Sequence, residues 1–300
     1  MFRAAIQVAS GFTRPVVVSS KTVAGTCQAG IGAFVIVNKD GWFVTADHII
    51  GQLQELLDSC DRVAKLKADR ATVEQDATID AKAKRKQLAR MKHPDDAHVE
   101  EFATWWGGDG LTVVDIKRLP QIDLAVGRLT PFDPTLVPAY PVFKNPSISF
   151  TIGASLCRLG FPFYDLSASW DATTRHFILP PTSVPIPLFA IDGILSRMIN
   201  FPLPPAQPGL VLPSFAWKMI ETSSPGLRGQ SGGPVFDAGG RIWGIQSSTK
   251  SYPLGFDPDV PGGKRGDKEH QFLNVGWGIH SETVTGMLAD LKVPFDQSTD

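Results

Sequence analysis

The segment 226–236 has the composition of a tight turn that presents a nucleophile. It reads Gly-Leu-Arg-Gly-Gln-Ser-Gly-Gly-Pro-Val-Phe, so Ser231 has a glycine two residues before it and Gly-Gly-Pro after it. Glycine lets the backbone approach a ligand closely and adopt φ values that a side chain would forbid. Such a turn can direct the amides of Gly229 and Ser231 at one point, where an oxyanion would be stabilised. A surface glycine turn with an idle serine is the alternative, so the interpretation needs partner residues.

Two other segments supply a base and a carboxylate. His48 follows the apolar run Gly41-Trp42-Phe43-Val44-Thr45-Ala46-Asp47, and Asp123 stands at the mouth of the apolar run Leu124-Ala125-Val126. Chymotrypsin-like enzymes have their catalytic histidine, aspartate and serine in this order, whereas subtilisin and the α/β-hydrolases order theirs differently.

On these residues the chain resembles a trypsin-like serine protease of the chymotrypsin fold, in the style of the bacterial HtrA/Deg protease domains but without a PDZ domain. The matching blocks are 32–48, 123–126, 153–162, 221–244 and 274–279. The resemblance implies an all-β fold of two six-stranded antiparallel β-barrels, which the many short β-rich runs between turn signals also favour. We expect an N-terminal barrel over 1–137 with His48 and Asp123, and a C-terminal barrel over 138–300 with Ser231. A closing helix capped by Ser281 is expected near the end.

The resemblance also implies a serine endopeptidase that cleaves polypeptides through an acyl-enzyme. His48 would act as the base, Asp123 would orient it, and Ser231 would attack, with the amides of Gly229 and Ser231 as the oxyanion hole. Should Asp123 not serve, Asp115 is the next candidate for the carboxylate. A dormant protease fold used as a binding scaffold, and a protease activated by a partner, are the alternatives.

The resemblance assigns substrate binding to seven residues around the turn. Ser247, Ser248 and Thr249 would form the edge strand that pairs with an extended substrate, and Arg228, Gly276 and Trp277 would lie nearby, with Trp277 making the pocket shallower. Trypsin carries an acidic residue six positions before the nucleophile, where this chain has Pro225. We therefore expect a small or apolar residue before the scissile bond (P1). Glu221 is the alternative source of a carboxylate.

Two insertions enlarge the expected barrels. Residues 51–106 contain no Gly or Pro from Gln52 to His93 and show helical periodicity. Ten Lys/Arg and five Asp/Glu in 61–92 give this region a net charge of +5, which suits either a solvated helical arm or a docking surface for an acidic protein partner. The second insertion, 177–213, is rich in proline, which holds a chain extended; it borders the cleft or forms a surface flap.

The overall composition favours no further class of ligand. The net charge of −1 over 300 residues gives no pull toward nucleic acid or membranes, and the histidines show no metal-binding spacing, so we expect neither metal nor cofactor. The three cysteines are too few for a disulfide framework. With no signal-peptide core at the start, these features predict a cytoplasmic protein.

Overall fold

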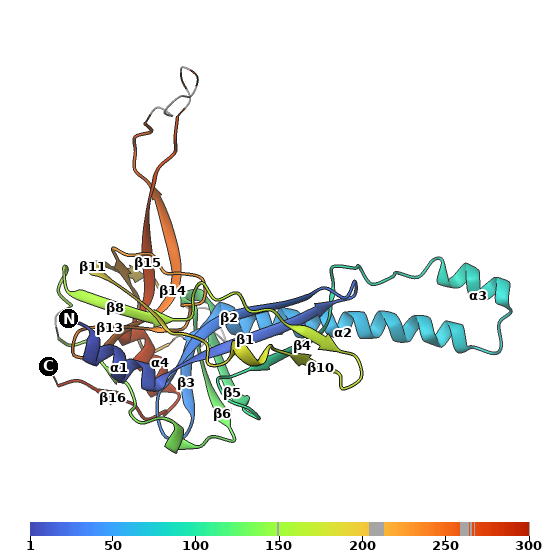
Figure 1. The fold of residues 1–300 in the computed structure, drawn as a ribbon, viewed down its shortest axis with the longest axis horizontal. Helices are drawn as coiled ribbons and strands as arrows, with labels where there is room; N and C mark the ends of the chain where they lie inside the picture. Colours follow the sequence, from blue (N-terminus) through green and yellow to red (C-terminus); the bar gives the residue numbers. More distant parts are fainter. Residues whose placement is uncertain (149, 204–212, 259–263, 265, 267, 300) are drawn as a thin grey trace.

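The computed structural model describes residues 1–148, 150–203, 213–258, 264, 266 and 268–299. Two β-sheets form the body, from which a long helix and a long hairpin project in different directions (Figure 1). The helices are α1 Arg3–Phe12, α2 Asp47–Gln75, α3 Ala81–Leu88 and α4 Ser281–Asp290.

The first sheet has six strands in the order β4-β1-β2-β3-β6-β5. Their bounds are β1 Thr13–Thr22, β2 Cys27–Ile36, β3 Trp42–Ala46, β4 Val99–Trp105, β5 Thr112–Leu119 and β6 Leu124–Thr130. All pairs are antiparallel. The register between β3 and β6 pairs Ala46 with Leu124, so the residues next to these, Asp47 and Asp123, meet at one end of the sheet.

The second sheet contains a closed barrel of six antiparallel strands. The pairing runs β13-β8-β11-β12-β15-β14 and returns to β13. The short strand β7 pairs in parallel with β14, and β16 pairs in parallel with β7, which extends the sheet to eight strands. The bounds are β7 Val142–Phe143, β8 Ser155–Gly160, β11 Phe189–Phe201, β12 Trp217–Thr222, β13 Pro234–Phe236, β14 Arg241–Pro253, β15 Phe272–His280 and β16 Asp296–Gln297. A separate hairpin joins β9 Ser169–Asp171 to β10 His176–Ile178. The expected all-β fold with two β units is confirmed.

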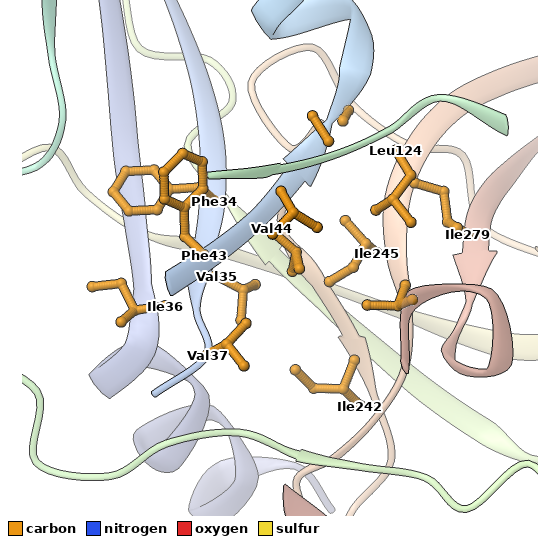
Figure 2. Close-up of a cluster of buried hydrophobic side chains, with 14 of the residues drawn as sticks. Phe34, Val35, Ile36, Val37, Phe43, Val44, Leu124, Ile242, Ile245 and Ile279 are labelled. Atoms are coloured by element: carbon orange, nitrogen blue, oxygen red, sulfur yellow. The ribbon is translucent and has the colours of Figure 1, made fainter. Parts of the chain in front are cut away.

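One apolar core runs from the first sheet into the second. Apolar side chains of β2, β3 and β6 pack with those of β14 and β15, including Val44, Leu124, Ile245 and Ile279 (Figure 2). Within the first sheet, Phe34, Phe43 and Trp106 form an aromatic cluster with ring centroids 5.2 and 5.3 Å apart. A backbone hydrogen bond from Ala33 N to Ser231 O (2.8 Å) connects β2 to the turn at 226–233 that carries Ser231, called the serine turn below. The cleft between the two β units is therefore backed by a continuous core.

The insertion expected to be helical over 51–106 differs in extent. The helix α2 begins at Asp47 and continues without interruption for 29 residues, and α3 follows it. The last part of the segment is strand β4, which pairs with the outer edge of β1 and belongs to the first sheet. The stretch of sequence without glycine or proline ends at Pro94, and the chain then returns to the sheet along α2 (Figure 1).

Two other expectations are corrected. The segment 177–213 is not a loop throughout, because β11 is a 13-residue strand inside the barrel between β8 and β12; residues 204–212 lie outside the described residues. The cap of α4 is His280 rather than Ser281. His280 Nδ1 accepts from Glu282 N (3.0 Å), while the Ser281 hydroxyl donates to Lys144 O (3.0 Å) inside the core.

Candidate active site

His48 and Asp123 meet where β3 passes into α2 and where β6 begins. His48 Nδ1 lies 3.1 and 3.0 Å from the two carboxylate oxygens of Asp123. The His48 amide also donates to Asp123 Oδ1 (2.8 Å), so the carboxylate satisfies a backbone donor in the first turn of α2. The imidazole is thus held by its Nδ1 side and presents Nε2 away from the carboxylate.

A third side chain contacts the carboxylate from the second barrel. The Ser247 hydroxyl donates to Asp123 Oδ2 (2.5 Å). Burial alone would raise the pKa of Asp123, but hydrogen bonds from His48 and Ser247 outweigh burial and hold that pKa below its usual value. The Asp123 hydrogen bond is also the largest cause that raises the pKa of His48. Asp123 therefore stays ionised beside the imidazole.

Ser231 lies on the turn between β12 and β13, facing the histidine across the cleft. His48 and Ser231 line one cavity of ≈ 230 Å³, together with Gly32, Ile49, Gln52 and Gly229 among others. In this structure the Ser231 hydroxyl donates to Ser247 O (3.2 Å). Catalytic hydrogen bonds often form fully only when substrate is bound, and a hydrogen bond between Ser231 and His48 would need the serine side chain to turn away from Ser247 O.

The turn before Ser231 presents two backbone amides. Gly229 has φ +96°, a conformation that disfavours a side chain, and its carbonyl accepts from Phe161 N (2.9 Å). Among the described residues, neither the Gly229 amide nor the Ser231 amide donates to another protein group. Two amides without a protein acceptor, with one residue between them on a fixed turn, can both bind an oxygen that gains negative charge.

A second cavity of ≈ 160 Å³ lies on the other side of Ser231. Its walls are the turn residues Gly226, Leu227 and Arg228 and the strand residues Gln246, Ser247, Ser248 and Thr249. The Thr249 hydroxyl donates to Gly226 O, which joins the two walls. Of the residues assigned to substrate binding from the sequence, the structure brings Arg228, Ser247, Ser248 and Thr249 together here.

Comparison with known protein families agrees with this geometry. The family model of the trypsin-like peptidase domain matches residues 30–245, which include His48, Asp123 and Ser231. The chain belongs to the trypsin-like peptidase family. It is thus a serine peptidase, a hydrolase of peptide bonds. No curated protein matches the sequence.

Solved structures show only remote likenesses to this trypsin-like peptidase. The active form of the Rv3671c protease from M. tuberculosis is 13% identical, with 98% of this chain and 87% of that chain covered and a TM-score of 0.45. The HtrA-type protease AlgW with a tripeptide is 15% identical, with 97% and 63% covered and a TM-score of 0.47. The serine endoprotease from Yersinia pestis is 15% identical, with 97% of this chain and 66% of that chain covered and a TM-score of 0.46. The family assignment rests on the family model.

Two residues expected near the substrate, Trp277 and Glu221, contact each other in this peptidase. Trp277 pairs with Glu221 across β15 and β12, and its Nε1 donates to Glu221 Oε2 (2.9 Å). Glu221 is also ion-paired with Arg197 (2.9 Å). Side chains alternate between the faces of a strand, so Trp277 and Glu221 lie on the face opposite to their neighbours Gly276 and Thr222. Neither is among the residues that line the cavity beside Ser231.

The other two candidates from the sequence, Pro225 and Asp115, do not line the cavity beside Ser231. Pro225 is half-buried next to the cavity without lining it. Asp115, the alternative carboxylate, is ion-paired with Arg128 on the exposed face of β5, and its Oδ2 accepts from Arg128 Nε (2.8 Å). It therefore has no contact with His48.

A larger cavity, ≈ 530 Å³ in volume, also borders the serine turn. It is lined by Ala29, Gly30 and Ile31 of β2, by the 161–166 loop, and by Leu227, Arg228 and Gly229. Phe163 projects beside it and is 77% exposed. Arg228 thus lines all three cavities around the serine turn.

Sequence reasoning missed two polar residues of the second barrel, Gln246 and Arg158. Both are almost fully buried. Gln246 precedes the Ser-Ser-Thr edge segment and could have been found from its place in that motif, whereas no local signal marks Arg158. Within the described ranges, no cluster of three or more His, Cys, Asp or Glu residues could hold a metal. Of the described helices, none has the length and apolar character needed to cross a bilayer. All three cysteines are unpaired.

Proposed function

We propose that this chain is an endopeptidase that cleaves polypeptides through an acyl-enzyme, with His48, Asp123 and Ser231 as its catalytic triad. The observation that carries the proposal is the pair of contacts around His48. Its Nδ1 is bound to Asp123, and its ring shares a cavity with Ser231 and the Gly229 turn. This is the arrangement that a serine nucleophile, its base and its oxyanion donors need.

In the first step Ser231 Oγ attacks the carbonyl carbon of the scissile bond while His48 Nε2 takes the hydroxyl proton. The carbonyl oxygen becomes an oxyanion, which the Gly229 and Ser231 amides bind. As the tetrahedral intermediate collapses, the C–N bond breaks and imidazolium gives its proton to the leaving amine. Water, which His48 deprotonates, then attacks the ester carbonyl. The bond between the acyl carbon and Ser231 Oγ breaks, His48 gives its proton to Ser231 Oγ, and the carboxylic acid leaves.

Asp123 keeps the imidazole in the tautomer with its proton on Nδ1 and stabilises the imidazolium. The lowered pKa of Asp123, which its hydrogen bonds sustain against burial, keeps it ionised throughout the cycle. The hydroxyl of Ser247 donates to Oδ2, the carboxylate oxygen that lies 3.0 Å from His48 Nδ1. The site thus joins a base from the first sheet to a nucleophile from the second.

A fluorophosphonate probe tests the proposal directly, because it labels only an activated serine. We expect covalent labelling of the wild type, none of Ser231→Ala, and strongly slowed labelling of His48→Ala. The matched control is Ser147→Ala, which removes an exposed hydroxyl outside the cleft and should label as the wild type does. If the wild type is not labelled, either with or without a protein substrate, the endopeptidase proposal fails and the alternative of a dormant protease fold used as a binding scaffold remains.

A further inference from the structure

A buried arginine lies inside the second barrel without an acidic partner. Arg158, on β8, is 2% exposed. Its guanidinium donates to Ser224 O (3.0 Å) and to the Thr222 hydroxyl, and among the described residues no carboxylate forms an ion pair with it. A buried cation without a counter-charge costs free energy that packing does not return, and such groups are frequent at functional sites.

Burial lowers the pKa of Arg158 to about 10. The side chain therefore remains protonated at neutral pH, and the positive charge persists inside the barrel. Its two recorded acceptors are neutral oxygens, which leave that charge uncompensated.

The strand register places this guanidinium on the same face of the sheet as the cavity of ≈ 160 Å³ beside Ser231. Gly276 is paired directly with Thr249 on one side and with Thr222 on the other. Directly paired residues project to the same face of a sheet. The Thr249 hydroxyl reaches the cavity wall at Gly226 O and the Thr222 hydroxyl contacts Arg158, so this part of the cavity and the guanidinium lie on the same face.

Gly276 marks where the guanidinium lies. A Cβ on Gly276 would be 2.3 Å from Arg158 Nη1 and 2.6 Å from Nη2. The arginine thus occupies the space that a side chain at 276 would fill. Ser224, whose carbonyl accepts from Arg158, is two residues before Gly226 in the cavity wall. The cationic group therefore lies between Gly276 of β15 and Ser224, close to the cavity wall that contains Gly226.

The cavity itself is polar at this end. Gln246 is 1% exposed, and its amide packs so close to Gly226 that a Cβ there would be 2.0 Å from Nε2. Gln246 Nε2 donates to Ser248 O (3.1 Å), whereas Gln246 Oε1 is buried without a partner in the described structure. An apolar side chain would leave both this amide and the arginine uncompensated.

We propose that this cavity receives an acidic P1 side chain, with Arg158 as its counter-charge and Gln246 as a polar wall. The inference rests on the proposed function, since it names the substrate class of the same site. It keeps the small size expected from the sequence but replaces an apolar side chain by aspartate or glutamate. Pro225, at the position where trypsin has its charged residue, is uncharged. The charge that selects the P1 side chain would come instead from Arg158 on β8.

The test is a set of matched peptides that differ only at P1. The wild type should cleave after Asp with kcat/KM at least about tenfold higher than after isosteric Asn, which corresponds to about 1.4 kcal/mol. Ala should resemble Asn. In Arg158→Gln the Asp-to-Asn ratio should fall to about one or below, and Arg158→Lys should retain part of it. Arg197→Gln is the matched control, because Arg197 lies in the same barrel but its side chain is 54% exposed and paired with Glu221; its ratio should equal that of the wild type.

Fluorophosphonate labelling separates failure of this inference from failure of the proposed function. A wild type that labels at Ser231 and cleaves after Asn or Ala as well as after Asp overturns the inference alone. A wild type that neither labels nor cleaves overturns the proposed function. The wild-type comparison needs no variant, so it remains decisive even if Arg158→Gln fails to fold.

Discussion

At the scale of single residues, the contacts of Asp123 explain why one carboxylate can serve three partners. Its backbone has φ 59°, in the left-handed region, directly after the short turn at Pro120–Ile122. In this conformation the carbonyl of Asp123 accepts from Asp47 N (2.9 Å) while the side chain reaches His48 and Ser247. The local fold around Asp123 therefore fixes the direction of the imidazole.

We expect Asp123→Asn to reduce kcat by several orders of magnitude while the protein stays folded. The amide has the size of the carboxylate, but it cannot enforce the required tautomer, and the same change in a related triad costs about 10⁴ in rate. Steady-state kinetics with a peptide substrate and circular dichroism check the two parts. Turnover close to that of the wild type would remove Asp123 from the triad.

The three triad substitutions should not be additive, because the residues act as one unit. Ser231→Ala/His48→Ala should be scarcely slower than either single variant. The comparison is made from kcat/KM of the four proteins. A further loss of about a hundredfold or more in the double variant would show that His48 acts independently of Ser231.

The pH profile should report the His48–Asp123 contact. His48 must be neutral to accept a proton, and Asp123 raises its pKa above the ordinary value of about 6.5. We therefore expect kcat/KM to fall as the pH decreases through this raised pKa. In Asp123→Asn the largest cause of the increase is absent, so the inflection of the residual activity should move to lower pH. An inflection unchanged by the substitution would contradict the assignment.

The catalytic residues proposed from the sequence are those that stand in a local motif. Ser231, His48 and Asp123 each stand at a fixed place beside a glycine turn or an apolar strand, so type and neighbours suffice. Arg158 differs, because its relation to Ser231 depends on the pairing of Gly276 with Thr222 and Thr249. Such a relation arises only when distant strands align, and no neighbouring residue in the sequence signals it.

At the scale of elements, α2 is both part of the site and the base of the projecting arm. Its first turn holds His48, and Asp47 forms a two-point ion pair with Arg118 of β5 (2.7 and 2.9 Å). Farther along, Lys67 contacts Glu100 of β4, which also binds Lys21 of β1. Beyond this point the helix leaves the body with α3 (Figure 1). Helical periodicity predicts α2 from sequence, but β4 is short and interrupted by charges, so pairing with β1 decides its state.

Replacing residues 69–94 by a short Gly/Ser linker should leave a folded peptidase with near-wild-type turnover of small peptides. The deletion removes the distal arm and keeps the Lys67–Glu100 contact and strand β4. Thermal unfolding and peptide kinetics are the measurements.

Replacing residues 55–104 provides the contrast. It removes most of β4 and exposes the edge of β1, so we expect a clear loss of thermal stability. If the shorter deletion folds but no longer turns over peptides, the distal arm belongs to the catalytic machinery.

At the scale of the whole molecule, the C-terminal segment ties the two β units together. After α4 the chain returns to β7 through β16, and Pro294 O accepts from Asn38 in the turn between β2 and β3 of the first sheet (2.8 Å). The start of α4 depends on His280, which is 2% exposed and stacked on Phe150 with ring centroids 4.1 Å apart. The plan of two β units could be predicted from short β runs, but the helix cap could not, because a serine next to the boundary is the commoner cap.

The buried cap should make the stability of the whole protein depend on pH. Burial, with a smaller effect from Lys218, lowers the pKa of His280 to about 3. In the unfolded chain a histidine takes up a proton below about pH 6.5, so the unfolded state binds more protons than the folded state between about pH 6.5 and 3. His280 therefore stabilises the fold above this range and loses that contribution as the pH falls, by about 1.4 kcal/mol for each unit below the unfolded pKa.

The matched variant is His280→Asn, which keeps a side-chain acceptor for Glu282 N but does not titrate. Urea unfolding between pH 7 and 5 avoids most of the range in which exposed carboxylates titrate. We expect the free energy of unfolding of the wild type to fall more steeply than that of the variant over this interval. The two curves should approach each other as the pH decreases. Equal slopes would mean that His280 is protonated in the folded protein, and the cap of α4 would then have to be held by another acceptor.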